Sequence, residues 1–106
     1  MLKLQVILSF LKSIQTKLNK TIRAKLSKNE KIFTQTLKIS EEVGELTNEI
    51  LKQSQHQRSE KTLIPANIKH ELADIILATI LLSIELEIDI EQALIEKMEI
   101  IDKRGI

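Results

Sequence analysis

Apolar residues recur every three or four positions along most of the chain, which is the period of an α-helix. No alternating apolar and polar run is long enough to predict a sheet. A first helix is expected over about residues 2–20, and a basic connector is expected over residues 20–28. The apolar face of this helix consists of Leu4, Ile7, Leu11, Ile14 and Leu18.

A second helix is expected to begin near Ser27. Ser27 and Glu30 have the spacing of a capping box, in which each side chain bonds the other residue's backbone N–H, and Asn29 is an alternative cap. The helix is expected to fade in the polar segment 53–59, which predicts a loop. Its apolar stripe, which Gln35 interrupts, consists of Ile32, Ile39, Val43, Leu46 and Ile50.

A third helix is expected from Pro65, which suits a first helical turn, to about Leu86. Residues 75–84 are apolar nearly all round, and a helix of that kind is normally buried on every side. The other helices of so short a chain can hardly cover it. The sequence therefore predicts a subunit interface along the third helix.

A fourth helix is expected between Asp89, which can cap it together with Gln92, and Gly105, which can end it. The prediction is an all-α fold, in which a four-helix subunit assembles into an oligomeric helical bundle. Residues 1–106 are expected to form a single domain. The apolar face of the fourth helix consists of Ile90, Ala93, Leu94, Met98 and Ile101.

Composition removes several kinds of chemistry. The chain has no cysteine, so it has no disulfide framework, thiolate metal site or thiol nucleophile. A small domain without disulfides fits the cytoplasm, which is the expected location. The longest uncharged apolar run, residues 75–84, is much shorter than the roughly 20 residues that a membrane span needs. No membrane association is expected.

Charge is distributed unevenly along the chain. Residues 1–31 carry eight basic residues and one acidic residue, a net charge of +7, whereas the remainder carries −6. A basic half can attract phosphates or an acidic partner, but it can equally form a solvated helix face. Nucleic acid is not an expected partner, because no aromatic residues alternate with the basic ones to stack on bases.

Two acidic pairs carry the candidate chemistry: Glu42 with Glu45, and Glu71 with Asp74. The members of each pair are three residues apart within a predicted helix, so they are neighbours on its surface. Two packed helices could therefore bring four carboxylates around one point. Such a group would repel itself unless it bound a cation or took up protons. Ligands that are all oxygen suit a hard ion such as Mg²⁺.

A helical wheel places Glu42 and Glu45 at the border of the apolar face of the second helix, with Lys38 on the same border. Glu41 points toward solvent. Asp74 lies among aliphatic residues, where an unpaired carboxylate would be costly. The alternative interpretation is that these are ordinary surface carboxylates on helices rich in Glu and Lys.

Residues 41–46 (Glu-Glu-Val-Gly-Glu-Leu) and 71–77 (Glu-Leu-Ala-Asp-Ile-Ile-Leu) resemble the EExxE…ExxD signature of MazG-like nucleotide pyrophosphohydrolases. This family belongs to the all-α NTP pyrophosphatase superfamily. The resemblance continues through residues 88–97 and covers about residues 29–104. Either acidic motif alone is weak, but the two in this order, followed by the helix that contains Lys97, are fairly specific.

The resemblance implies a helical subunit that forms a homodimer or homotetramer. It also implies Mg²⁺-dependent cleavage of an NTP or dNTP to the monophosphate and pyrophosphate, as in nucleotide-pool house-cleaning, with Mn²⁺ as a substitute ion. Carried over by position, the metal ligands would be Glu42, Glu45, Glu71 and Asp74.

The same resemblance implies that Lys97 contacts phosphate, as Lys38 could, and that Glu41 handles the attacking water. Many members have Asn where this chain has Ile101, and relatives commonly hold the base with aromatic residues, of which this chain has only Phe10 and Phe33. The base is therefore not specified, and Phe33 is expected to be a core residue.

Two other functions remain open. Phosphoribosyl-ATP pyrophosphohydrolase would use the same metal site on a different substrate. A non-catalytic oligomerisation or regulatory module would explain the third helix and the basic N-terminal region without chemistry, and it would bind no Mg²⁺.

Overall fold

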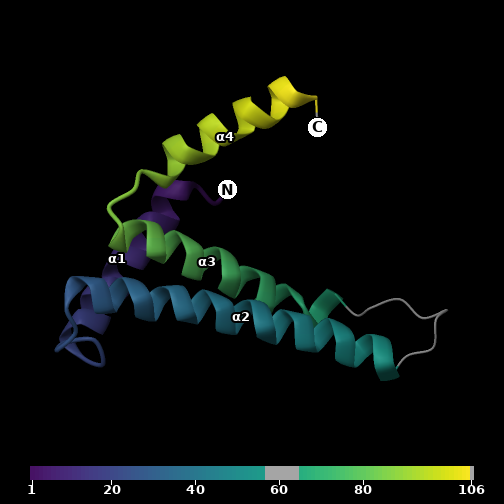
Figure 1. The fold of residues 1–106 in the computed structure, drawn as a ribbon, viewed down its shortest axis with the longest axis horizontal. Coiled ribbons are helices and arrows are strands. Elements are labelled where there is room, and N and C mark those ends of the chain that lie inside the picture. The colour runs from purple at the N-terminus through teal and green to yellow at the C-terminus, as the bar shows by residue number, and fades with distance from the viewer. Residues whose placement is uncertain (57–64, 106) are drawn as a thin grey trace.

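The structure is a computed structural model that describes residues 1–56 and 65–105. Within these residues the chain forms four α-helices and one short 3₁₀ helix, and it contains no strand (Figure 1). This architecture confirms the all-α prediction. The elements are α1 (Leu4–Lys20), α2 (Lys28–His56), η1 (Pro65–Asn67), α3 (Lys69–Glu85) and α4 (Ile90–Arg104).

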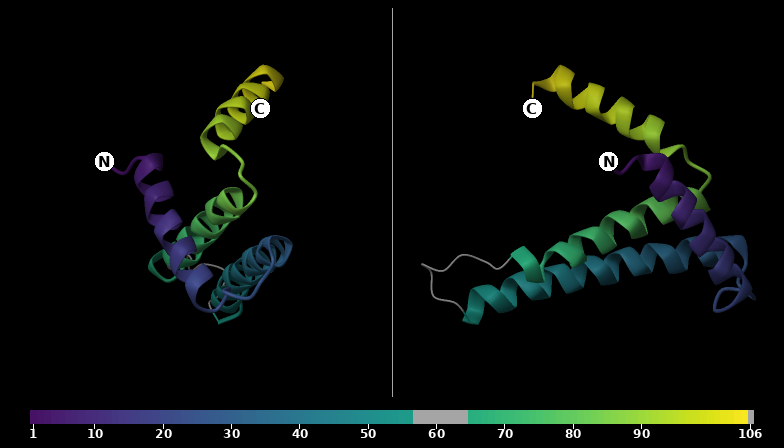
Figure 2. Two further views of the ribbon diagram at one scale, coloured as in Figure 1. Left: turned by 90° about the vertical axis from the view of Figure 1, so that its left-hand side faces the viewer. Right: turned by 180° about the vertical axis from the view of Figure 1, so that it is seen from behind.

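Helices α2 and α3 lie side by side, and α1 crosses them at the end where α2 begins (Figures 1 and 2). The small apolar core lies between α1 and α3, where Leu11 packs with Ile80 and Leu81. The expected apolar face of α1 is confirmed, since each of its five members is buried or half-buried. The fold therefore presents α2 and α3 to each other along most of the length of α3.

The start of α2 is fixed by the predicted capping box. The Glu30 backbone N–H donates to Ser27 Oγ at 3.1 Å, and the Ser27 backbone N–H donates to Glu30 Oε1 at 2.8 Å. Asn29, the alternative cap, lies inside the helix. The hydrogen bond from the Ser27 backbone is the main reason why the pKa of the Glu30 carboxyl lies below its ordinary value of 4.5, and the side chain of Ser27 acts in the same direction.

Ser27→Ala should lower the free energy of unfolding by about 1 kcal/mol, because α2 loses the cap for one of its orphan N–H groups. Urea unfolding measures this loss. Ser40→Ala, an exposed change within the same helix, is the control. The ionised Glu30 carboxylate also contributes to the free energy of unfolding. This contribution is present above pH 4.5 and is lost as the pH falls through the lowered pKa of Glu30. An unchanged midpoint for Ser27→Ala would contradict the role of the cap.

The expected start of the third helix at Pro65 was wrong. Pro65 opens the separate turn η1, and α3 begins at Lys69 after the buried Ile68. Its end at Glu85 agrees with the prediction. The loop predicted after residue 53 begins later, since α2 continues to His56, and residues 57–64 lie outside the described residues.

The face of α2 that meets α3 agrees only in part with the predicted stripe, because Ile32, Ile39 and Leu46 belong to both but Val43 does not. Val43 is 43 % exposed, whereas Gln35 and Glu42 are buried to 2 % and 6 % exposure. Gln35, which seemed to interrupt the stripe, donates through Nε2 to the Ala78 carbonyl of α3 at 2.9 Å. The residues on this face, spaced alternately three and four apart, form a partly polar seam: Ile32, Gln35, Ile39, Glu42, Leu46, Glu49 and Gln53.

Apolar surface remains uncovered on α3 and α4. Leu72 and Ile76 of α3 are about half exposed, so this helix is not buried on every side within one chain. Asp89 caps α4 as predicted by accepting from the Gln92 N–H at 3.1 Å, and Gly105 ends it in the left-handed conformation. Yet α4 points away from the α2–α3 pair and buries no residue (Figure 2).

Among the described residues, none of the helices combines the length and apolar character that a membrane crossing requires.

Candidate metal centre

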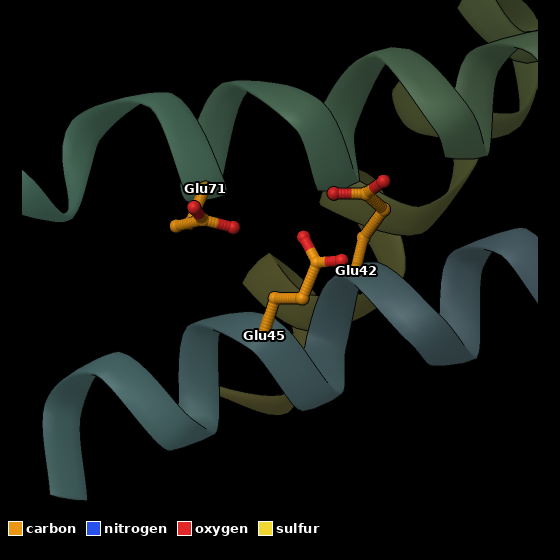
Figure 3. A group of neighbouring side chains, drawn as sticks. All are labelled: Glu42, Glu45 and Glu71. Carbon is orange, nitrogen blue, oxygen red and sulfur yellow. The ribbon is translucent and has the colours of Figure 1, made fainter. Parts of the chain in front are cut away.

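Three carboxylates meet between α2 and α3. Glu42 and Glu45 project from successive turns of α2, and Glu71 projects toward them from the first turn of α3 (Figure 3). One oxygen from each of the three residues lies within 4.8 Å of the others. The structure thus brings together three of the four residues that the sequence suggested as metal ligands.

This group contains buried oxygen atoms without partners. Glu42 Oε2 and Glu71 Oε2 are both inaccessible to solvent and accept no hydrogen bond within the described part of the chain. A buried acceptor without a donor is costly, and for a carboxylate the cost is larger still. A cation between the three carboxylates would satisfy both atoms, and an all-oxygen set suits Mg²⁺ or Mn²⁺. The residues present therefore fit a divalent metal ion.

Electrostatics supports the same interpretation. The negative charge of Glu42 raises the pKa of the Glu45 carboxyl above 4.5, and burial and the charge of Glu71 act in the same direction. A carboxyl whose pKa is raised by neighbouring negative charges is typical of functional sites, although structural clusters of charge show it as well. A bound cation would remove this repulsion.

Lys38 is already paired within the chain. Its Nζ lies 3.0 Å from Glu42 Oε1 and 3.5 Å from Glu41 Oε1, and the hydrogen bond to Glu42 is the main cause of its raised pKa. Glu41 is exposed, as the helical wheel indicated. Lys38 thus supplies one positive charge to the edge of the acidic group through its salt bridges. Its contact with phosphate stays a prediction.

Asp74 does not join the group of three. Asp74 is exposed, and so are Leu72 and Ile76, which precede and follow it by two residues in the sequence. The argument that aliphatic neighbours bury Asp74 was therefore wrong. Asp74 instead lines the wall of a cavity next to Glu42. Its role as a metal ligand stays a prediction.

Lys97 lies on α4, which diverges from α2 and α3 (Figure 1). Its side chain is exposed and does not line the cavity beside Glu42. Within one chain the structure therefore does not bring Lys97 to the carboxylates, and its contact with phosphate also stays a prediction.

A cavity of about 640 Å³ adjoins the acidic group. Its walls come from the end of α1, the α1–α2 connector, the first half of α2 and the middle of α3. Glu42 belongs both to this cavity and to the group of three. The expectation that Phe33 is a core residue was wrong, since it is 62 % exposed. The cavity is also lined by two buried polar residues for which the sequence predicted no functional role, Arg23 and Gln35.

The comparisons with known proteins agree with this geometry. The family model of the MazG nucleotide pyrophosphohydrolase domain matches residues 30–105, which include α2, α3 and α4 and all the acidic residues discussed above. No curated protein and no solved structure matches the chain significantly. Because the family match spans most of its length, the chain belongs to the MazG nucleotide pyrophosphohydrolase family.

Proposed function

We propose that this protein is a Mg²⁺-dependent pyrophosphohydrolase that converts an NTP or dNTP to its monophosphate and pyrophosphate. The observation that carries the proposal is the meeting of Glu42, Glu45 and Glu71 between two helices of a MazG-family chain. Removal of unwanted nucleotides from the cytoplasmic pool would be the corresponding physiological role.

The proposed chemistry divides between the ion and the chain. When bound, Mg²⁺ would neutralise negative charge on the triphosphate oxygens and would lower the pKa of the attacking water. Glu42, Glu45 and Glu71 would hold the ion, and Asp74, on the wall of the adjoining cavity, would be a further ligand. Glu41, exposed beside the site, is the carboxylate available to accept a proton from water.

Two lysines can stabilise the negative charge of the leaving pyrophosphate. Lys38 lies at the edge of the carboxylate group, held by its ion pairs with Glu41 and Glu42. Lys97 would have to come from a second subunit or from a movement of α4, because α4 diverges from the site within one chain. Neither lysine needs to lose its proton for this role.

The assembly is proposed to be a homodimer or homotetramer. Isolated helices of about 15 residues are marginal in water, and α4 has 15 residues with none buried. A second copy that covers Ile76 of α3 and Met98 of α4 would remove this exposure.

Light scattering after size exclusion should therefore give a mass two or four times the 12.2 kDa of one chain. Ile76→Lys should shift the mass toward a single chain, because a charge in an apolar interface is left unpaired. A single-chain mass for the unchanged protein at micromolar concentration would contradict this assembly.

The test of the proposed function is pyrophosphate release from a panel of NTPs and dNTPs, with Mg²⁺, with Mn²⁺ and with a chelator. Release that requires the ion supports the proposal. Including phosphoribosyl-ATP in the panel decides between the two substrate classes that share this site. No release and no Mg²⁺ binding by calorimetry would instead indicate a non-catalytic module.

A further inference from the structure

The cavity beside the carboxylates is lined by a buried arginine whose side chain has unpaired nitrogens within the part of the chain that the structure describes. Arg23 is only 7 % exposed and lines this cavity, yet its Nε and Nη1 donate no hydrogen bond within the described residues. A guanidinium remains charged at any ordinary pH and has five N–H donors. Burying it unpaired is costly, so an occupant of the cavity that offers acceptors would be favoured.

Gln35 adds an acceptor to the same cavity. Its Nε2 is committed to the Ala78 carbonyl at 2.9 Å, which fixes the orientation of the amide. Its Oε1 is buried and accepts no hydrogen bond from residues 1–56 or 65–105. Nε or Nη1 of Arg23 forms a donor fork together with Nη2, so the cavity offers such a fork and one oriented acceptor from Gln35.

The rest of the lining indicates what kind of group would occupy this end of the cavity. Most of the wall is aliphatic, with Leu11, Leu18 and Leu81 among its members. On the side next to the metal centre, Glu41, Glu42 and Asp74 supply three negative charges against the one positive charge of Lys38, so the net charge there is negative. An anion without a metal ion would be repelled there, whereas a neutral, planar heterocycle with polar edges matches an apolar wall with a few polar groups.

We propose that Arg23 and Gln35 select the nucleobase of the substrate in this cavity. This inference rests on the proposed function, because Glu42 joins the cavity to the carboxylate group and so places a triphosphate beside the metal centre when the base is inside. Arg23 lies outside residues 30–105, the part of the chain that the family model matches.

The donor and acceptor pattern defines the preferred bases. A guanidinium fork pairs with two neighbouring acceptors, as it does with O6 and N7 of guanine. The Gln35 acceptor then requires a donor next to these two acceptors on the rim of the base. Guanine offers N7 and O6 followed by N1–H, and cytosine offers O2 and N3 followed by its amino group. Adenine and thymine offer no two neighbouring acceptors, so they are the disfavoured bases.

The activity test compares dGTP, dCTP, dATP and dTTP under Mg²⁺ for the unchanged chain, Arg23→Met and Lys25→Met. Lys25 is an exposed cation of the same connector and is the matched control. We expect kcat/KM to be higher for dGTP or dCTP than for dATP and dTTP by roughly 10- to 100-fold, the range of one bidentate pair. Arg23→Met should remove this preference, mainly through KM, and Lys25→Met should retain it.

A second readout does not depend on turnover. Calorimetry with dGMP, dCMP, dAMP and dTMP, without any metal ion, should show the same order of affinities, and Arg23→Met should abolish the order. Should Arg23→Met not fold, Arg23→Lys keeps the charge without the planar fork and should also lose the preference.

Equal affinities of the four monophosphates for the unchanged chain, or a preference that survives both Arg23 variants, would overturn the base-selecting role. Failure of the proposed function looks different: no pyrophosphate release from any nucleotide, with the order of monophosphate affinities still reporting on the cavity.

Discussion

Glu42→Gln is expected to reduce Mg²⁺-dependent pyrophosphate release by more than about 100-fold. Glu42 is the buried member of the carboxylate group, and it also pairs with Lys38 at 3.0 Å and lines the adjoining cavity. Loss of a residue that merely orients a metal ligand already costs about 10- to 100-fold, and loss of a ligand should cost more. Steady-state turnover with a saturating nucleotide measures the effect.

The control for this variant is Glu49→Gln, which makes the same chemical change seven residues further along the same seam, outside the group of three. Its turnover should stay close to that of the unchanged chain, and circular dichroism should show both variants to be helical. Turnover of Glu42→Gln that equals that of Glu49→Gln would remove the carboxylate group from the mechanism.

Mg²⁺ should raise the melting temperature of the substrate-free protein by roughly 10–20 °C when the ion is present at about 100 times its Kd. Binding at that excess stabilises the folded state by about 2.7 kcal/mol. One kcal/mol corresponds to a shift of roughly 4–8 °C for a domain of this size. The cause is the relief of repulsion among Glu42, Glu45 and Glu71 and the satisfaction of their buried oxygens. Thermal melts with Mg²⁺ and with a chelator measure the shift.

Glu45→Gln separates this effect from a general effect of salt. In chelator the variant should melt no lower than the unchanged chain, because Glu45 is exposed and its charge is repelled by Glu42. With Mg²⁺ it should show little of the rise, because one of three ligands is gone. A full rise in Glu45→Gln, or no rise in the unchanged chain, would argue against a metal centre at this position.

Local signals in the sequence predicted the helix ends well. Ser27 with Glu30 and Asp89 with Gln92 act within a single turn, so their spacing alone predicted hydrogen bonds that the structure contains. Pro65 misled for the same local reason, since a proline that suits the first turn of an α-helix also suits the 3₁₀ turn that precedes α3.

The orientation of α2 was harder to predict, because burial there does not follow hydrophobicity. Gln35 and Glu42 occupy the face toward α3, while Val43 points outward. A helical wheel centred on the aliphatic residues therefore predicted a contact face of α2 that included Val43 and left Glu42 at its border. A search for positions three and four residues apart in alternation, which accepted polar as well as apolar residues, would have identified the seam.

The sequence predicted that Glu42, Glu45 and Glu71 lie close together. Their proximity depends only on helix periodicity and on the pairing of α2 with α3. Arg23 could not be predicted. It is the one arginine among the basic residues of 1–31, but its burial depends on how α1 crosses the other helices, which the sequence does not show.

The most direct test of the central claim is the identity of the products, followed by ³¹P NMR as the protein turns over a nucleoside triphosphate with Mg²⁺. Cleavage between the α- and β-phosphates predicts equal amounts of nucleoside monophosphate and pyrophosphate, with no reaction after chelation of the ion. Formation of the diphosphate and orthophosphate, or an unchanged spectrum for every nucleotide supplied, would contradict the assignment of this site as a pyrophosphohydrolase centre.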